Sequence, residues 1–481
     1  MTEKKRMQTQ SLFLLLFLLL CAGCGRQKAE AAAPAYAPQT DESADAALPT
    51  AEFRTVGHTE ELESLFASLP GGEGKGELVS RGACSGDRIA SRGDVLYLLR
   101  DYALEICRMD PAGVVKLGAV ETGFLWQEDS REGSWSGREK QCVSLLLSGN
   151  RLVILSALYA YAIDESDGQW SSVDSSRSIV DIYDVTQPEK PLWMRSFAQS
   201  GSESVCLLAK GELFLLTERA IYPDDTLGKG TTPGWWQGEE WTALDASCLY
   251  ACEGGVSAYV QLGVYPLETA STPDSCALLG CRDALLCERG FYGLIPGNGE
   301  SAVYYLPIID GAVGKPICSV FRESYASVSE LTGAGDTLCL LQDGSPGDAS
   351  GQWQRSYDEQ RTLCLSLTEN AVRLALRRNG SLEELVGVTL GWDFRAAVDA
   401  DSAIFTDPER GLIGLPCEDG YSLYALEEGE FRHVLDCYSS DLPQNRRIIL
   451  RDNILFVADR KRLFTIDLDS QEIKGTLTFS P

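Results

Sequence analysis

The sequence offers only two histidines, His58 and His433, as bases for a catalytic nucleophile. Neither lies near a G-x-S-x-G segment or an activated cysteine motif, which are the settings typical of triad hydrolases. Phosphate-binding segments of the GxxxxGK[ST] type, or a GxGxxG after a predicted strand, do not occur either. The sequence therefore indicates neither a catalytic triad nor a nucleotide site, and we expect a binding protein rather than an enzyme.

Acidic pairs supply a second kind of chemistry. Asp224 with Asp225, or Glu239 with Glu240, could act as glycosidase carboxylates, but these must face one another at about 5–10 Å across a cleft. A chain with 70 acidic residues contains such pairs by chance, so solvated loop charge is the favoured interpretation. Segments 164–168 and 347–353 lack the EF-hand spacing. We therefore predict no metal and no cofactor, with a structural Ca²⁺ as the alternative.

A cluster of aromatic residues is the strongest candidate binding site. Tyr222, Trp235, Trp236 and Trp241 stand in or beside a long loop rich in Gly, Pro and Thr. Exposed rings on a loop of a rigid scaffold bury much area at little entropic cost. The alternative is that the loop folds back and uses the rings as its own small core. Other tryptophans in predicted inter-strand loops suggest that one face collects aromatic rings; these are Trp126, Trp135 and Trp170.

The elements that must position these residues are short antiparallel strands. Residues 178–218 alternate apolar and polar residues between Pro, Gly and Asp turns, and weaker copies follow to the end of the chain. A recurring four-strand unit of about 40–60 residues is typical of a β-propeller. The strand groups cover about 77–122, 140–198, 202–268, 273–321, 325–379, 382–437 and 445–479.

The sequence thus predicts an all-β fold, a β-propeller of about seven four-stranded blades over 77–481, with six or eight blades as alternatives. Residues 51–76 carry a short helical pattern in which Leu62, Leu65 and Phe66 share one face. We expect a strand near 51–56 to close the ring by pairing with the last blade.

The N-terminus indicates where the protein sits. Residues 1–23 combine a basic start with an apolar stretch too short to span a bilayer, and C-A-G-C ending at Cys24 resembles a bacterial lipoprotein signal. That resemblance implies lipidation of Cys24 and a cell-membrane anchor on the extracytoplasmic side. Residues 24–50 are rich in Ala, Pro and acidic groups, so we predict a disordered tether.

The formal net charge of −28 excludes a class of partners. Such a surface repels nucleic acid and anionic headgroups. The membrane is therefore expected to be a partner only through the lipid anchor, and nucleic acid is not expected to bind.

The sixteen cysteines do not read as a disulfide framework. Cys107, Cys142, Cys206, Cys339 and Cys364 sit inside apolar strand patterns, where a free thiol behaves as a small hydrophobe. We predict mostly unpaired, buried thiols. The best place for one or two bridges is the group Cys248, Cys252, Cys276, Cys281 and Cys287.

Four stretches resemble the bacterial secreted β-propeller domain family that is distantly related to WD-40 repeats. They are VDIYDVTQPEKPLWMRSFAQSGS, ALLGCRDALLCERGFYGLIP, DSAIFTDPERGLIGLP and RDNILFVADRKRLFTIDLDSQEI, and the resemblance covers roughly residues 75–481. It implies a propeller and supplies no catalytic residue to carry over.

The leading hypothesis is a non-enzymatic lipoprotein that binds or scaffolds a protein or glycan through inter-strand loops. The alternatives are a carbohydrate-active hydrolase with carboxylates at the propeller channel, and a structural subunit of an envelope complex.

Overall fold

The computed structural model describes residues 54–55, 78–80, 86–131, 134–166, 169–221, 231–251, 258–269, 272–281, 283–288, 290–296, 301–321, 325–330, 338–342, 352–379, 383–398, 400 and 403–479. Within these ranges the regular structure is almost entirely β-strand, which confirms the predicted all-β class. The helices described there are the short 3₁₀ turns η1 (Ala246–Cys248), η3 (Trp392–Ala397) and η5 (Pro443–Asn445). None of the helices in the described ranges is long and apolar enough to cross a membrane.

Four sheets are four-stranded antiparallel meanders in which each strand pairs with the next along the chain. The first contains β3 (Ile89–Arg92), β4 (Val95–Leu99), β5 (Ala103–Asp110) and β6 (Gly113–Glu121). The second contains β27 (Gln352–Ser356), β28 (Arg361–Leu367), β29 (Val372–Arg378) and β30 (Glu384–Leu390). The third contains β31 (Phe405–Asp407), β32 (Leu412–Cys417), β33 (Gly420–Glu427) and β34 (Glu430–Tyr438). The fourth contains β35 (Arg447–Arg451), β36 (Ile454–Ala458), β37 (Arg462–Asp467) and β38 (Glu472–Thr478).

Three larger sheets are formed by the chain between the first and second meanders, together with two short strands that precede the first meander. One has the order β16-β15-β12-β11-β9-β8-β7, with β10 on β9. Its strands are β7 (Phe124–Arg131), β8 (Ser134–Ser148), β9 (Arg151–Ser166), β10 (Gln169–Asp174), β11 (Arg177–Asp184), β12 (Leu192–Ser200), β15 (Gly234–Gln237) and β16 (Glu240–Ala243). A second has the order β1-β17-β19-β18-β14-β13. Its strands are β1 (Arg54–Thr55), β13 (Glu203–Ala209), β14 (Glu212–Ala220), β17 (Leu249–Ala251), β18 (Ala258–Pro266) and β19 (Asp274–Leu279).

The third larger sheet has the order β2-β20-β21-β22-β23, with β24 also on β22, and β25 and β26 form a separate pair. These strands are β2 (Leu78–Ser80), β20 (Asp283–Cys287), β21 (Gly290–Pro296), β22 (Ser301–Ile309), β23 (Ala312–Val313), β24 (Ile317–Phe321), β25 (Tyr325–Glu330) and β26 (Leu338–Gln342).

Two-residue turns fix the register of several hairpins. Lys210-Gly211, Asp310-Gly311 and Glu428-Gly429 have positive φ at both residues, which is the geometry of a type I′ turn. The twist of this turn matches that of the strands it joins. Glycine serves at the second position because it adopts positive φ without a steric penalty.

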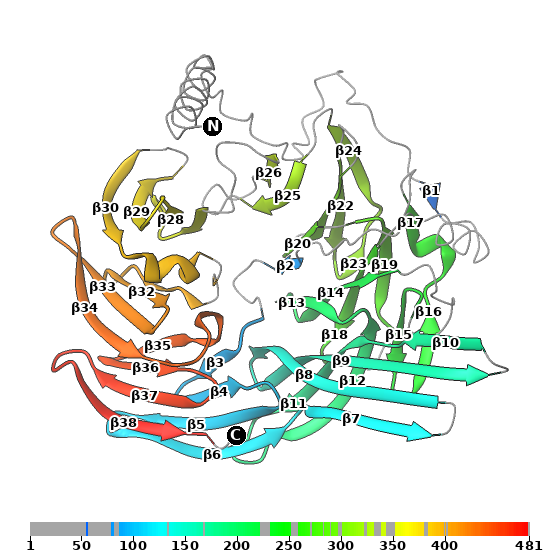
Figure 1. Cartoon of the computed structure of the whole chain (residues 1–481), viewed down its shortest axis with the longest axis horizontal. Coiled ribbons are helices and arrows are strands. Elements are labelled where there is room, and N and C mark those ends of the chain that lie inside the picture. Colours follow the sequence, from blue (N-terminus) through cyan, green and yellow to red (C-terminus); the bar gives the residue numbers. More distant parts are fainter. Residues whose placement is uncertain are drawn as a thin grey trace, which may run out of the picture. The chain divides into compact units, whose positions relative to one another are not determined.

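Neighbouring sheets pack through apolar side chains that alternate along the strands. One buried cluster joins Tyr97 and Ile106 of the first meander to Leu145 and Ile154 of β8 and β9. Another joins Leu98 and Cys107 to Phe456 and Leu463 of the last meander, and β38 lies beside β6 (Figure 1). The first and last meanders therefore share a core although the chain between them is long.

The strand expected near 51–56 pairs elsewhere than predicted. Arg54 and Thr55 pair with Ala251 and Tyr250 of β17 and not with the last sheet. The pattern of a strand does not identify its partner, and two residues make too short a pairing to be inferred from alternation. The rest of the predicted helical lead-in, with Leu62, Leu65 and Phe66, lies outside the described residues, as do residues 1–50 and Cys24.

Several predicted strand groups also differ from the sheets. Strand β2 of the group 77–122 pairs with β20, β19 of the group 273–321 pairs with β18, and β30 of the group 382–437 belongs to the preceding meander. The group 202–268 is divided, because the hairpin β15–β16 joins β12 of the preceding sheet. The group 325–379 is divided between the β25–β26 pair and the meander that starts at β27. The last group, predicted at 445–479, matches its sheet closely, at 447–478, whereas the sheet of the first group begins only at 89.

The thiols that the structure describes are mostly buried. Cys107, Cys142, Cys206, Cys364, Cys417 and Cys437 are buried and form no disulfide, as predicted for the strand cysteines among them. In the group proposed for bridges, Cys248 and Cys276 carry free thiols, and Cys252 lies outside the described residues.

Candidate functional site

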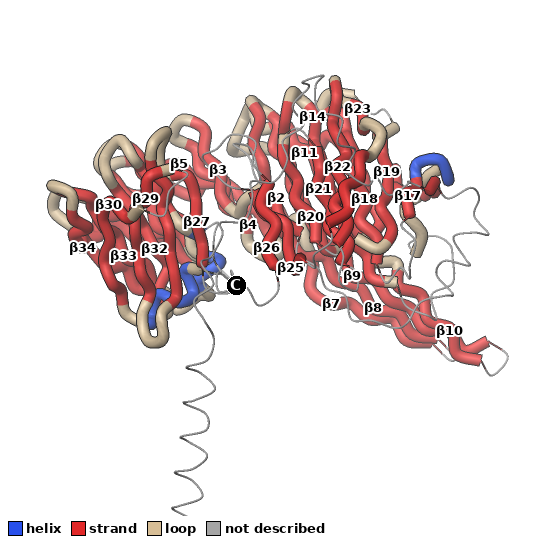
Figure 2. Tube along the Cα trace, turned by 90° about the horizontal axis from the view of Figure 1, so that it is seen from above, coloured by secondary structure: helices blue, strands red, loops and turns tan. Residues whose placement is uncertain are grey.

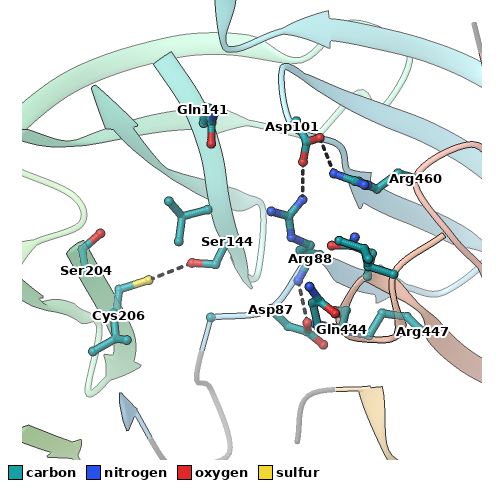
Figure 3. Close-up of a pocket in the computed structure, with 15 residues that line it drawn as sticks. Asp87, Arg88, Asp101, Gln141, Ser144, Ser204, Cys206, Gln444, Arg447 and Arg460 are labelled. Carbon is teal, nitrogen blue, oxygen red and sulfur yellow. Dashed lines mark hydrogen bonds and ion pairs between the residues drawn. The ribbon is translucent and has the colours of Figure 1, made fainter. Parts of the chain in front are cut away.

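A polar pocket of about 510 Å³ opens where the first strands of several sheets meet. Its walls come from the segment before β3 and the turn after β4, from β8, from β13, and from the segment around β35 and the turn after β36 (Figure 3). The charged and polar lining side chains are Asp87, Arg88, Asp101, Gln141, Ser144, Ser204, Gln444, Asn445, Arg447 and Arg460. Residues more than 350 positions apart in the chain thus face one cavity.

Asp101 holds two arginines from opposite ends of the sequence. Arg88 Nη1 donates to Asp101 Oδ1 at 3.0 Å, and Arg460 Nη1 donates to Asp101 Oδ2 at 2.7 Å (Figure 3). Charge-assisted bonds of this length are the strong kind. The two guanidinium groups are therefore fixed in orientation at the pocket wall.

A second ion pair closes the same seam. Arg447 Nε donates to Asp87 Oδ1 at 2.6 Å, and the backbone N–H of Arg88 donates to the same oxygen at 2.6 Å. Arg447 Nη1 also donates to the carbonyl of Gln444 at 2.7 Å. The side chain of Arg447 is buried, so this pair joins the first meander to the last at the floor of the pocket.

The buried carboxylate of Asp441, which is not among the lining residues, supports Arg460. Asp441 accepts from Arg460 Nη2 at 2.9 Å and from its backbone N–H at 2.8 Å. Burial raises the pKa of Asp441, but the hydrogen bonds from Arg460 outweigh it and hold the pKa below its usual value. The carboxylate is thus the form that orients Arg460.

Arg446 organises the loop that precedes β35. This fully buried side chain donates to the carbonyls of Glu418 and Ser439, each at 3.0 Å, and to those of Cys417, Gly420 and Asp441. Burial lowers the pKa of Arg446, and nearby Cys417 and Asp441 oppose that effect. Because the guanidinium satisfies several carbonyls at once, the loop that carries Gln444 and Arg447 is held firmly.

The opposite wall carries neutral side chains. Ser144 Oγ and Cys206 Sγ lie 3.5 Å apart, and Gln141 Nε2 donates to Glu139 Oε1 at 3.0 Å. Burial raises the pKa of the Cys206 thiol to about 12. Since the thiolate is the reactive form, Cys206 is an unreactive part of the wall and not a nucleophile.

The arrangement is suited to holding a polar molecule. Each lining arginine is ion-paired with a carboxylate, and both lining carboxylates, Asp87 and Asp101, accept from guanidinium groups. Three lining arginines face these two carboxylates, and the buried Asp441, which pairs with Arg460, balances the third positive charge. Oriented donors and acceptors of this kind suit a neutral ligand rich in hydroxyl groups.

The predicted aromatic site is placed only in part. Trp235 and Trp236 lie on β15 and Trp241 lies on β16, so these rings belong to a hairpin added to β12. Trp236 is 1% exposed, its ring centroid is 6.4 Å from that of Trp241, and Arg177 stacks over it at 4.9 Å. Trp235 and Trp241 are half-buried. Tyr222 lies outside the described residues.

The other predicted candidates do not line the pocket. Glu239 is exposed in the β15–β16 turn, Glu240 is exposed at the start of β16, and His433 Nε2 bonds Asp436 Oδ1 at 2.8 Å on β34. Asp224, Asp225, His58 and residues 347–351 fall outside the described ranges. Among the described residues no group of three or more His, Cys, Asp or Glu side chains could hold a metal ion.

Sequence reasoning missed the pocket residues. Asp87-Arg88 and Arg446-Arg447 each stand just before or at the start of an apolar strand, and charged pairs at that position were the available signal. Nothing in their spacing shows that they meet.

No protein-family model matches the chain, and no curated protein has a matching sequence. Solved structures show a partial likeness. The "Crystal Structure of Mitotic Checkpoint Complex" is 11% identical over 76% of this chain and 83% of that chain, with a TM-score of 0.31. The dihydro-heme d1 dehydrogenase NirN in complex with DHE is 9% identical over 83% of this chain and 78% of that chain, with a TM-score of 0.38. A functionally unknown protein from Desulfotomaculum acetoxidans is 9% identical over 78% of this chain and 92% of that chain, with a TM-score of 0.29. These TM-scores are low, so the likenesses assign no function to this chain.

Proposed function

We propose that this chain is a membrane-anchored, extracytoplasmic lipoprotein of the β-propeller type that binds a neutral glycan without transforming it. The single observation that carries the proposal is the pocket in which Arg88, Asp101, Arg460 and the buried Asp441 form one charge-matched network of ion pairs. Sugar hydroxyls both donate and accept hydrogen bonds, so they can use arginines and carboxylates whose charges are already matched.

The arrangement of the sheets supports the propeller. Four sheets are meanders of four consecutive strands. One apolar cluster joins the third meander to the fourth, and another joins the fourth to the first. In a propeller the innermost strands of the blades surround a central channel. The strands β3, β8, β13 and β35, or the residues just before them, all contribute to the pocket, which is the position that such a channel would have.

A hydrolase is the second candidate, and the pocket argues against it. Glycoside hydrolysis needs one carboxyl group as a proton donor and another as a nucleophile or base. The two lining carboxylates are instead occupied by Arg88, Arg447 and Arg460. We therefore favour binding, and incubation with a bound oligosaccharide should release no reducing ends.

The test uses the full chain in detergent micelles and calorimetric titration with neutral disaccharides built from glucose, xylose, mannose or N-acetylglucosamine. Replacing Gln141 by Leu removes one hydrogen-bonding side chain of the wall while keeping its bulk. The loss of one such bond is expected to weaken binding about fivefold. Gln187→Leu is the control, because Gln187 is exposed and does not line the pocket. Absence of binding by every disaccharide, or equal affinities for both variants, would overturn the proposal.

A further inference from the structure

Three aromatic side chains on adjacent strands form a surface outside the pocket. Trp126 of β7 and Trp135 of β8 have ring centroids 6.0 Å apart and planes inclined by 30°. Trp135 and Tyr161 of β9 are 6.2 Å apart, inclined by 59°. Trp126 is 43% exposed and Tyr161 is 38% exposed. We call these three residues the stacking face.

The stacking face lies on a β-arm that extends beyond the body of its sheet. The pairing of β9 with β11 ends at Leu158 with Arg177, whereas β9 continues to Ser166 alongside β8 and β10. Figure 2 shows β7, β8 and β10 projecting together at this end. The arm therefore presents its rings away from the shared cores.

Trp126 is held flat by its surroundings. A Cβ atom on Gly137 would lie 2.1 Å from Cζ2 of Trp126, so the indole rests directly against the backbone of Gly137. Trp126 Nε1 also donates to Glu128 Oε1 at 2.7 Å. The ring thus has one face against the sheet and a fixed orientation before any ligand binds, which reduces the entropic cost of binding.

The stacking face and the pocket lie on the same side of β8. Side chains two residues apart share a face of a strand, and Trp135, Gly137, Glu139 and Gln141 precede the bulge between Cys142 and Ser144. Tyr161 is the direct partner of Gly137 and therefore projects to that side as well. Gln141 lines the pocket. One face of β8 thus leads from the rings to the pocket.

Polar groups occupy the stretch between them. Glu139 Oε1 accepts from Tyr102 Oη at 2.7 Å and from Gln141 Nε2 at 3.0 Å. The hydrogen bond to Glu139 raises the pKa of Tyr102 to about 12, so the phenol remains a neutral donor. A carboxylate, a phenol and an amide follow the rings along the strand.

We infer that the stacking face binds successive sugar units of an extended neutral glycan whose end occupies the pocket. This inference rests on the proposed function and names the ligand as an oligosaccharide chain. From Trp135 to Gln141 the strand advances about 20 Å, so a chain of several units spans both places and a disaccharide does not. Pyranose rings present a C–H face that packs on an indole, and their hydroxyls meet the polar groups beyond.

One observation favours a glycan over a protein segment, and a second favours a neutral ligand over an acidic one. A protein interface is expected to surround its aromatic anchors with well-packed apolar contacts, whereas Glu139, Gln141 and Tyr102 lie next along this face. The formal net charge of −28 disfavours an acidic ligand.

The experiment compares neutral hexasaccharides with the corresponding disaccharides by titration of the full chain in micelles. The hexasaccharide is expected to bind about tenfold more tightly, because aromatic stacking contributes only to the longer ligand. Trp126→Ala and Trp135→Ala should reduce hexasaccharide affinity to the disaccharide level and leave disaccharide affinity unchanged. Trp193→Ala is the matched control, since Trp193 is 55% exposed on β12 and remote from the arm in the pairing register.

Gly137→Ala tests the same inference without removing a ring. The added methyl group displaces Trp126, so the affinity loss should match that of Trp126→Ala, and combining both changes should add nothing further.

The outcomes separate the two proposals. If disaccharides bind but the tryptophan variants keep full hexasaccharide affinity, the role of the stacking face is wrong and the role of the pocket is retained. Loss of all disaccharide binding overturns the pocket. The glycan assignment would also be overturned if a protein binds through Trp126 and Trp135 while the tryptophan variants keep the hexasaccharide affinity of the unmodified chain.

Discussion

The carboxylate of Asp87 is bonded by the guanidinium of Arg447, a residue 360 positions later in the chain, at 2.6 Å. Asp87 precedes the first meander, and Arg447 begins the last one. A short bond between the two restrains both sheets at the pocket floor.

Breaking this pair should destabilise the fold. Arg447→Met leaves Asp87 without its guanidinium partner, and the expected loss in the free energy of unfolding is about 2–4 kcal/mol. Chemical denaturation measures it, and a cycle with Asp87→Asn should give a coupling of about 1 kcal/mol or more. The control is Arg432→Met, whose pair with Glu427 is exposed and should contribute about 1 kcal/mol or less. Equal losses for the two variants would contradict the role given to Arg447.

The carboxylate of Asp441 should make the protein sensitive to acid. Its folded-state pKa is below the usual 3.8, so it contributes stability that is fully present above that value and is lost as pH falls through the lower, folded-state pKa. Asp441→Asn should lower stability at pH 7 and flatten its decline below about pH 4. Unfolding free energies measured from pH 7 to pH 2.5 check this. An unchanged slope in the variant would count against it.

Buried thiols should resist alkylation in the native protein. Burial raises the pKa of Cys107 and of Cys206 to about 12 each, so at pH 8 almost no thiolate is present at either site. Iodoacetamide followed by peptide mass spectrometry should label the half-buried Cys248 well before Cys206. Labelling of Cys206 at the rate of Cys248 would show that the pocket wall opens.

Truncation of two tryptophans should change the stability of the protein to very different extents. Trp236 is 1% exposed beneath Arg177, so Trp236→Ala should destabilise the protein by about 3–5 kcal/mol. Trp126 is 43% exposed, so Trp126→Ala should change stability by about 1 kcal/mol or less. Thermal unfolding followed by circular dichroism distinguishes them. A large loss for Trp126→Ala would mean that its ring is a structural support of the β-arm.

The strand content followed from local patterns, and the pairing of distant strands did not. Alternating residues and turn residues such as Lys210-Gly211 are visible in the sequence, which is why the last meander was predicted closely. The β15–β16 hairpin could not be placed, because its pairing with β12 depends on contacts that alternation does not encode.

The candidate site shows the same division. Trp126 and Trp135 were expected to share a face but were assigned to loops, whereas they lie in β7 and β8 with their centroids 6.0 Å apart. Asp101, Arg88 and Arg460 form one network, yet each alone resembles an ordinary solvated charge. Their convergence is a property of the packing between sheets.

The ion pair between Asp87 and Arg447 also determines at which stage of chain synthesis the pocket can form. A ribosome makes Asp87 and Asp101 early and Arg447 and Arg460 late, so the pocket lacks the wall formed by residues 442–460 until most of the chain has emerged. Pairings of such long sequence separation close slowly. The proposed ligand therefore meets a complete pocket only after Arg447 and Arg460 have been made and packed against the residues around Asp87 and Asp101.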